Sequence, residues 1–292
     1  MNRKILLIAL AFSVIVVIAL GFFFFRECPK QMSDVKVVAT EPVKEDSLLP
    51  EALPDNTYLL MATLYQQQSA EYRALCLQAF RSAREALLQD LADKSIDKPR
   101  AIITDIDETV LDNSPFQAAC ILNNTDYPIG WDEWCMMANA EAVPGALEFF
   151  RLANGYGIDV FYVTNRKEHL KEATLRNLVA LGFPDADTEH VMMRTKTSDK
   201  EPRRSKIEER FHIALFIGDN LADFSNDFYH NEGDARRDAV DKTAINFGKR
   251  WIVLPNPMYG DWESAFYKGY DKLDDTTRLL IMHDMLVAPE RL

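Results

Sequence analysis

Short apolar runs alternate with helix-forming segments along most of this chain, and this alternation constrains the fold more than any other feature. Most of the runs are rich in β-branched and aliphatic residues, as is typical of parallel strands that are covered on both faces. They are residues 101–104, 158–163, 191–193, 213–217 and 251–254. The stretch from Lys167 to Leu181 has a helical pattern and ends at Gly182. The alternation predicts an α/β fold built on a doubly wound parallel sheet.

Two further segments are expected to be helical. From Tyr58 to Asp93 the spacing of Leu, Tyr, Phe and Ala fits two amphipathic helices or one long helix before the first strand. The segment between the first two strands is too long for a simple crossover. We therefore expect the insertion 113–150 to form a smaller helical cap region over one edge of the sheet. The sheet and these helices make up one predicted domain, residues 56–292.

The N-terminus carries a membrane signal. Arg3 and Lys4 precede an uncharged apolar stretch, residues 5–25, which as a helix would span roughly 30 Å, the thickness of a bilayer core. Basic residues before such a helix favour a cytoplasmic N-terminus. We predict a membrane anchor in residues 1–25 and a linker in residues 26–55, rich in Lys, Glu, Pro and Ser. The catalytic domain would then face the periplasm or the cell exterior.

Two alternatives to an uncleaved anchor remain open. A cleaved signal peptide would end at a small-x-small site, which Val37-Val38-Ala39 fits, although it lies far beyond the apolar stretch. A lipoprotein would be modified at Cys28, although Arg26 and Glu27 are charged where small apolar residues are usual.

Composition excludes some functions. The net charge of −12 and the absence of a basic stripe argue against binding of a nucleic-acid polymer. The four cysteines show no Cys-x-x-Cys spacing, so neither a zinc site nor a redox motif is predicted. In an exported protein Cys120 and Cys135 could pair, but buried free thiols are the preferred interpretation.

Asp105 and Asp107 follow the first predicted strand directly. Two carboxylates at this spacing point to the same side of the chain, at the edge where open α/β sheets hold their active sites. One carboxylate can attack a phosphorus atom while the other transfers protons, with Mg²⁺ balancing the charges. The alternative is an ordinary strand-to-turn junction, where Asp is common.

Three further polar clusters argue against that alternative. Thr164-Asn165 follows the second strand, Lys200 precedes a helical stretch, and Asp219 and Asp223 follow the fourth strand. In this order the four clusters resemble the signature of the haloacid-dehalogenase-type phosphatases. Residues 105–114, 218–224 and 254–263 are similar to the class C acid phosphatases, and more closely to the 5′-nucleotidase, lipoprotein e(P4) family. The likeness covers roughly residues 58–262.

The resemblance implies a role for each carboxylate. Asp105 would be the nucleophile that forms an aspartyl-phosphate, and Asp107 would be the general acid and then the general base. Mg²⁺ would be bound by the carboxylates of Asp105 and Asp219 and by the backbone carbonyl of Asp107. Asp223 would support the metal as a neighbouring carboxylate.

The resemblance also implies how the phosphate is held. Thr164 and Asn165 would bind its oxygens, and Lys200 would neutralise their charge. Lys200 stands just before the predicted helix and fits the family's Lys-x-x-Arg spacing with Arg203, while Lys196 is the alternative.

Two aromatic residues, Trp131 and Tyr259, resemble the pair that sandwiches the substrate's ring in the e(P4) branch. Stacking contributes ~1–3 kcal/mol per base, so such a pair could select nucleotides, although ordinary packing is the alternative. Phe116 departs from the family, which often has Tyr in this segment. The lack of a convincing lipidation site is a second departure.

The function predicted from the resemblance is a Mg²⁺-dependent phosphomonoesterase that acts outside the cytoplasm on nucleoside 5′-monophosphates, including nicotinamide mononucleotide. A broad-specificity acid phosphatase is the second interpretation. A non-catalytic surface protein that binds a ligand such as haem belongs to a different class. Members of the family are often dimers, so a homodimer is compatible with the resemblance.

Overall fold

A five-stranded parallel sheet forms the centre of the fold, in the strand order β5-β4-β1-β6-β7. The computed structural model describes residues 56–229, 233–267, 273 and 275–289. All five strands predicted from the apolar runs are present, and every pairing between them is parallel. Their bounds are β1 Arg100–Thr104, β4 Asp159–Lys167, β5 Val191–Arg194, β6 His212–Gly218 and β7 Trp251–Val253.

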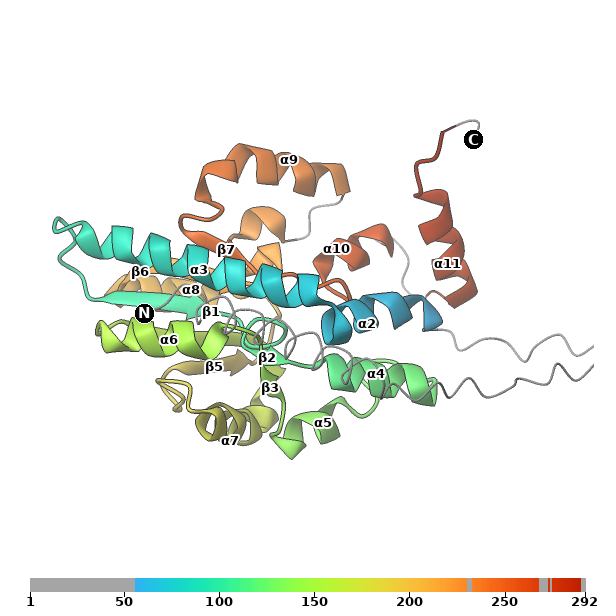
Figure 1. Cartoon of the computed structure of the whole chain (residues 1–292), viewed down its shortest axis with the longest axis horizontal. Coiled ribbons are helices and arrows are strands. Elements are labelled where there is room, and N and C mark those ends of the chain that lie inside the picture. The colour runs from blue at the N-terminus through green and yellow to red at the C-terminus, as the bar shows by residue number, and fades with distance from the viewer. Residues whose placement is uncertain (1–55, 230–232, 268–272, 274, 290–292) are drawn as a thin grey trace, which may run out of the picture. The chain divides into compact units, whose positions relative to one another are not determined.

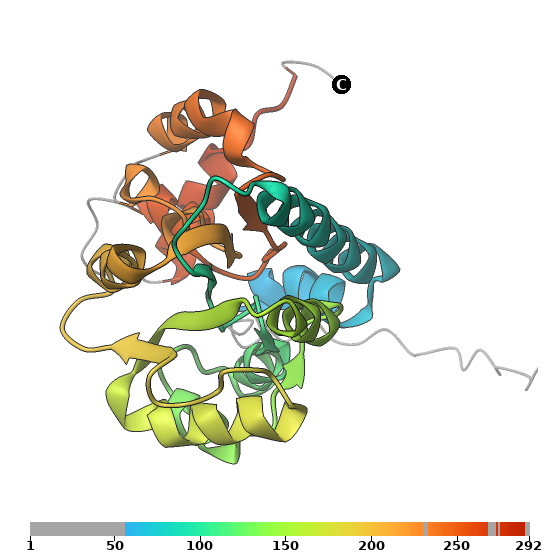
Figure 2. The same cartoon turned by 90° about the vertical axis from the view of Figure 1, so that its left-hand side faces the viewer.

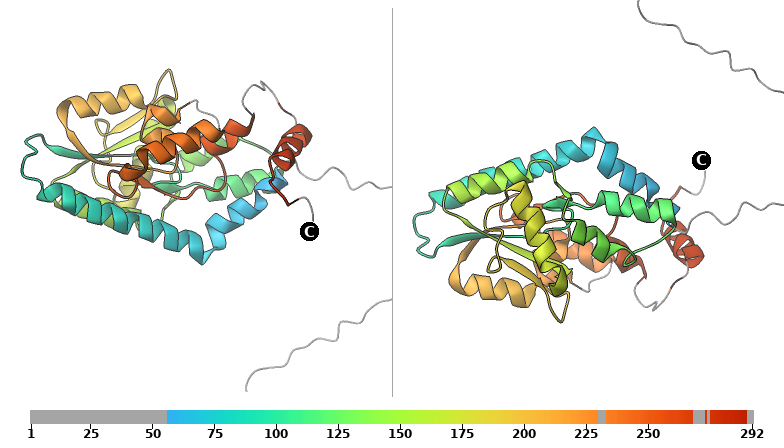
Figure 3. Two further views of the ribbon diagram at one scale, coloured as in Figure 1. Left: turned by 90° about the horizontal axis from the view of Figure 1, so that it is seen from above. Right: turned by 90° about the horizontal axis from the view of Figure 1, so that it is seen from below.

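Helices cover both faces of the sheet, which confirms the doubly wound arrangement. One face packs against α3 (Ala70–Ala92), α6 (Ala146–Gly155) and α7 (Lys171–Leu181), and the other against α8 (Glu201–Arg210) and α9 (Gly233–Thr243). Figure 3 shows α3 and α8 on opposite sides of the strands. In β1, Ile102 joins the first core cluster while Ala101 and Ile103 join the second. This double burial explains why the run contains no regular polar positions.

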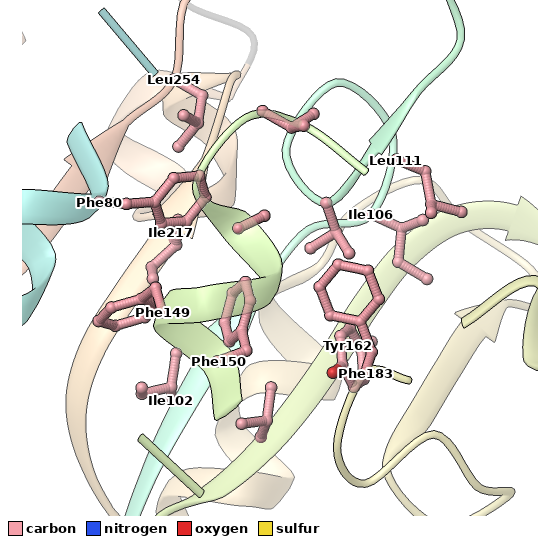
Figure 4. Close-up of a cluster of buried hydrophobic side chains, with 14 of the residues drawn as sticks. Phe80, Ile102, Ile106, Leu111, Phe149, Phe150, Tyr162, Phe183, Ile217 and Leu254 are labelled. Atoms are coloured by element: carbon pink, nitrogen blue, oxygen red, sulfur yellow. The ribbon is translucent and has the colours of Figure 1, made fainter. Parts of the chain in front are cut away.

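Aromatic side chains dominate the core between α3, α6 and the sheet (Figure 4). Phe80 of α3 lies 5.7 Å from Phe149 and 6.0 Å from Phe150 of α6, between ring centroids. Phe150 also lies 6.2 Å from the ring of Tyr162 in β4. Burying a side chain of this size stabilises the fold by ~1.5–3 kcal/mol. These contacts hold α3 and α6 side by side against the sheet (Figures 1 and 2).

The predicted N-terminal helical segment forms two helices, α2 (Leu60–Gln68) and α3, after the short turn η1 (Thr57–Leu59). Ser69 separates them. Its backbone is extended, and its hydroxyl oxygen accepts a hydrogen bond from the backbone N–H of Tyr72 at 3.0 Å. Its hydroxyl also donates to the carbonyl of Tyr65 at 2.6 Å. One serine therefore ends one helix and caps the next.

The cap region is not wholly helical. It contains α4 (Ser114–Asn123) and α5 (Trp131–Met137), as predicted, but also the two-residue strand β3 (Glu141–Ala142), which pairs antiparallel with β2 (Leu111–Asp112) just before the insertion. Strands this short carry no periodicity that a sequence pattern could reveal. Figure 1 shows α2, α4 and α10 beyond the carboxyl ends of the strands. The remaining elements are η2 Glu168–Leu170, η3 Leu221–Asp223, η4 Asn226–Phe228, η5 Ala244–Asn246, α10 Asp261–Ser264, η6 Ala265–Tyr267 and α11 Asp275–Asp284.

The predicted anchor (1–25), the linker (26–55) and Cys28 lie outside the described residues, so they stay predictions. Among the residues that are described, no helix has the length and apolar character needed to cross a membrane. Cys76, Cys120 and Cys135 are buried free thiols, so Cys120 and Cys135 do not pair.

Candidate active site

The turn after β1 presents the two predicted catalytic carboxylates. The backbone N–H of Asp105 still pairs with Ile217 of β6 at 2.9 Å, so this residue belongs to the edge of the sheet. The chain then turns through Glu108, whose φ of 57° is unusual for a residue other than glycine. Asp105 is buried, whereas the side chain of Asp107 is 17% exposed. Asp107 is therefore the more exposed of the two carboxylates, and it lines the cavity described below.

Three carboxylates lie close together next to this turn. Oxygens of Asp105, Asp219 and Asp223 all lie within 4.8 Å of one another. Burial raises the pKa of Asp105, opposed by Lys200 and reinforced by Asp223. Burial, and next the negative charge of Asp223, raises the pKa of Asp219 to about 7. The carboxylates of this compact set repel one another, and a bound cation would relieve that repulsion. Carboxylate oxygens are the ligands that a divalent cation such as Mg²⁺ prefers.

Asp219 is oriented by two neutral donors. The hydroxyl of Thr109 donates to one of its carboxylate oxygens at 3.2 Å, and the amide of Asn256 donates to the other at 2.8 Å. Neither donor was predicted to belong to the site, although both lie in the segments on which the family resemblance depends. Asp107 contributes no carboxylate oxygen to the acidic cluster, which leaves its backbone carbonyl as the predicted ligand.

Lys200 is the cation of this cluster. It is 7% exposed, and its Nζ donates to Asp105 and to Asp223, each at 2.5 Å. Burial lowers its pKa, but the two carboxylates outweigh this effect and raise it, so the ammonium stays charged. Lys196, the alternative, is exposed. The position of Lys200 at the start of α8 is what brings it to the carboxylates.

Asp107 is held by groups that the sequence did not identify. Nε of Arg166 donates to its Oδ1 at 2.9 Å, and Asn113 donates to the same oxygen at 2.9 Å. Nη2 of Arg166 lies 2.8 Å from this oxygen as an ion pair and donates to the side-chain oxygen of Asn113 at 3.2 Å. The other oxygen of Asp107, Oδ2, accepts only a longer bond of 3.4 Å from Thr164. Burial lowers the pKa of Arg166, but the charge of Asp107 raises it further, so the guanidinium stays charged. The arrangement leaves Oδ2 for proton transfer.

Thr164 and Asn165 lie near the carboxyl end of β4, as predicted. Arg203 fixes both, because it donates to the carbonyl of Thr164 at 2.5 Å and to the side-chain oxygen of Asn165 at 2.8 Å. Arg203 is the second basic residue of the Lys-x-x-Arg spacing that starts at Lys200. The two cations of this motif therefore contact two different parts of the site.

A cavity of about 430 Å³ opens beside Asp107, and both Trp131 and Tyr259 line it. Trp131 packs edge-on against Phe116, with ring centroids 5.0 Å apart, and the guanidinium of Arg166 lies 5.6 Å from its ring. The hydroxyl of Tyr259 donates to Glu108. Burial raises the pKa of Glu108 well above its usual value, and the charges of Asp107 and Asp219 add to this. A volume of this size suits a small organic ligand.

Comparison with known proteins adds independent information. The family model described as HAD superfamily, subfamily IIIB (acid phosphatase) matches residues 33–262. The structure of the class C acid phosphatase from Bacillus anthracis with tungstate bound is 40% identical, with a TM-score of 0.78. That match covers 82% of this chain and 99% of the other.

Two plant proteins are more distant relatives. Acid phosphatase 1 of Solanum lycopersicum is 27% identical over 165 residues, and the chain spans 57% of its length. Vegetative storage protein 1 of Arabidopsis thaliana is 24% identical over 205 residues, which cover 69% of this chain and 67% of that protein.

Proposed function

Because this chain belongs to subfamily IIIB of the HAD superfamily, the acid phosphatases, we propose that it hydrolyses phosphomonoesters through Asp105 and Asp107. The observation that carries the proposal is Lys200, whose buried ammonium bridges Asp105 and Asp223 beside Asp219. Such a cluster destabilises the folded protein, because buried like charges repel, so its presence indicates that it has a function. This cost also argues against a purely ligand-binding, haem-type role.

In the first step a carboxylate oxygen of Asp105 attacks phosphorus, and the bond between phosphorus and the alcohol oxygen breaks. Asp107 gives its proton from Oδ2 to the departing oxygen. The product of this step is an aspartyl-phosphate on Asp105 and a free alcohol. Lys200, already in contact with Asp105, attracts the negative phosphoryl oxygens throughout.

In the second step Asp107 takes a proton from water, and the water oxygen attacks phosphorus. The bond between phosphorus and Asp105 breaks, which releases inorganic phosphate and restores both carboxyl groups to their starting state. Arg166 and Asn113 hold Asp107 in place during both proton transfers, since each donates a hydrogen bond to its Oδ1.

Mg²⁺ is the metal we propose, because the donors are all hard oxygens. The carboxylates of Asp105 and Asp219 and the backbone carbonyl of Asp107 would hold it, and Asp223 would support it as a neighbouring carboxylate. When bound, the ion neutralises charge on the transferring phosphoryl group.

Nucleoside 5′-monophosphates, including nicotinamide mononucleotide, are the proposed substrates. The support is that Trp131 and Tyr259 line the same cavity as Asp107, so a flat ring can contact them while its phosphate lies near Asp105. A broad-specificity acid phosphatase is the alternative. We also propose that the enzyme acts outside the cytoplasm and is attached to the membrane by an anchor in residues 1–25. We further propose that it is a homodimer, which sedimentation of the purified protein would test.

The test of the proposal measures hydrolysis of adenosine 5′-monophosphate and of a small aliphatic phosphate, with Mg²⁺ and with EDTA. EDTA should abolish both activities. Replacing Trp131 with Ala should raise KM for the nucleotide about tenfold, the effect of losing one stacking partner, and should change the aliphatic phosphate much less. An equal effect on both substrates would assign Trp131 to packing and favour the broad phosphatase. No hydrolysis of either substrate by the unmodified enzyme would refute the proposed activity.

A further inference from the structure

A second hollow lies next to the active-site cavity and shares one residue with it. Its volume is about 610 Å³, and Arg194 lines both spaces. We call it the cationic hollow. Its lining comprises Lys167, Glu168, His169, Arg194, Thr195, Lys196, Thr197 and Ser198.

The cations of this hollow come from neighbouring strand ends. Lys167 at the end of β4 is the register partner of Arg194 at the end of β5, and Lys196 follows two residues later. Parallel pairing thus brings Lys167 and Arg194 to the edge of the sheet that holds the active site, and Lys196 lies in the segment that follows β5. A positive region here is unexpected in a chain whose net charge is −12.

These three cations have no internal counter-charge. Among the described residues, none of the three side chains takes part in an ion pair or a hydrogen bond, whereas the cations of the catalytic cluster are all engaged. The single carboxylate of the lining, Glu168, lies 3.8 Å from the ammonium of Lys171. His169 is bonded to Asp132 at 2.7 Å. The hollow therefore carries an excess of positive charge that is available to a ligand.

We propose that the cationic hollow binds a second phosphate of the substrate. The substrate class would then include phosphomonoesters whose alcohol carries another phosphate, such as nucleoside 3′,5′-bisphosphates. This inference rests on the proposed phosphatase function, and it adds a subsite beyond the aromatic pair. Arginine binds phosphate through two parallel N–H groups, and the hydroxyls of Thr195 and Thr197 add further donors.

The reaction at Asp105 is unchanged by the second phosphate. Asp105 attacks the 5′-phosphorus, the 5′ ester bond breaks, and water later releases inorganic phosphate. The 3′ ester bond stays intact in the hollow. Adenosine 3′,5′-bisphosphate should therefore give adenosine 3′-phosphate as its first product, which chromatography identifies.

The test compares adenosine 3′,5′-bisphosphate with adenosine 5′-monophosphate in a variant that combines Lys167→Gln and Lys196→Gln. At low salt, kcat/KM for the bisphosphate should fall about fivefold, mostly through KM, because each exposed charge contact is weak. The monophosphate should change less than about twofold. At 0.5 M salt the difference should shrink, since exposed charges are screened. The matched control, Lys242→Gln with Lys249→Gln, removes two exposed charges from α9 and from the turn before β7.

An equal loss for both substrates would overturn the subsite, because it would mean that the hollow only attracts anions in general. Equal kinetics in the variant and the unmodified enzyme would overturn it too. Calorimetry of adenosine 3′,5′-bisphosphate binding to Asp105→Asn protein, with and without the two lysine substitutions, separates this inference from the proposed function. If the unmodified enzyme hydrolysed neither substrate, weaker binding after loss of the lysines would still support the subsite.

Discussion

The carboxylates of this site differ in whether a positively charged side chain lies beside them. Asp107 is paired with Arg166, while Asp105 and Asp223 share Lys200. Asp219 is bonded only to neutral donors, Thr109 and Asn256. It is therefore the carboxylate that gains most from a bound cation, consistent with a pKa raised to about 7 in the metal-free protein by burial and by Asp223.

This difference predicts how pH affects the metal-free protein. Because the folded-state pKa of Asp219 is raised, the folded protein binds a proton there more tightly than the unfolded chain. The free energy of unfolding should therefore fall as pH rises from about 4 to about 7, and Mg²⁺ should reverse the loss. Asp105 and Glu108 shift in the same direction.

Thermal unfolding in EDTA at several pH values measures this effect. The control is Asp219→Asn, which cannot ionise and should show a weaker pH dependence. A melting temperature of the metal-free enzyme that rises with pH over this range would contradict the account.

A second prediction concerns Arg166, which is 2% exposed and holds Asp107. Replacing it with Gln should lower kcat about 100-fold, because a positioned general acid and base contributes roughly 10²–10⁴-fold to the rate and Asp107 would lose the group that orients it. Mg²⁺ binding should persist, since the acidic cluster is untouched. The matched control is Arg176→Gln, because Arg176 is more than half exposed and makes surface contacts away from the site, an ion pair with Glu172 and a hydrogen bond to the carbonyl of Met136. Near-normal kcat in the Arg166 variant would exclude the positioning role.

At the scale of elements, the junction between β6 and η3 shows how close packing sets the site. A Cβ placed on Gly218 would lie 2.3 Å from Oδ2 and 2.6 Å from Cβ of Asp223. Only glycine allows Asp223 to fold back against the end of its own strand. There its Oδ2 accepts a hydrogen bond from the backbone N–H of Asn220 at 3.1 Å.

Gly218→Ala should therefore destabilise the protein by ~1–3 kcal/mol, as expected when an atom is forced into a packed region. It should also weaken Mg²⁺ binding by displacing Asp223. Gly155→Ala is the matched control, because a Cβ there meets nothing within 4 Å. That change should be neutral or stabilise α6 by ~0.5–1 kcal/mol. Urea unfolding compares the two variants, and equal stabilities would contradict the packing argument.

Helices and strands with a long hydrophobic pattern were predictable from the sequence. Elements that are defined only by a pairing between distant residues were not. The strands were found because double burial leaves an unbroken apolar run, as in Ile102-Ile103. The two-residue strands β2 and β3 were missed because pairing alone defines them. Arg166 was missed because its partner, Asp107, is distant in sequence. The one indication in the sequence was that Arg166 directly follows Thr164-Asn165 near the end of a predicted strand.

At the scale of the whole molecule, the acidic chain has a net charge of −12, but the sheet edge that we propose to bind phosphate places Lys200 and Arg166 among its carboxylates. The charge of −12 repels anionic substrates at long range, but salt screens this beyond about 10 Å. Lys200 and Arg166 act within the site itself, where screening is weak. The net charge of the molecule therefore gives no guide to its substrate.

The whole chain is also expected to be attached to a membrane through residues 1–25. Full-length protein should stay in the membrane fraction after a high-salt wash, because an apolar helix is held by lipid and not by charge. Mass spectrometry should find the native N-terminus. A mature chain that starts at a lipid-modified Cys28 would favour the lipoprotein, and one that starts at Thr40 would favour cleavage and release.

The most direct test of the central claim is to trap the covalent intermediate on Asp105. Turnover is stopped with acid, the protein is reduced with borohydride, and its peptides are identified by mass spectrometry. Since borohydride reduces an acyl phosphate but not a free carboxylate, the account predicts homoserine at position 105, and none in Asp105→Asn protein treated alike. Homoserine at another aspartate, or unmodified Asp105 under conditions of rapid turnover, would contradict the proposed mechanism.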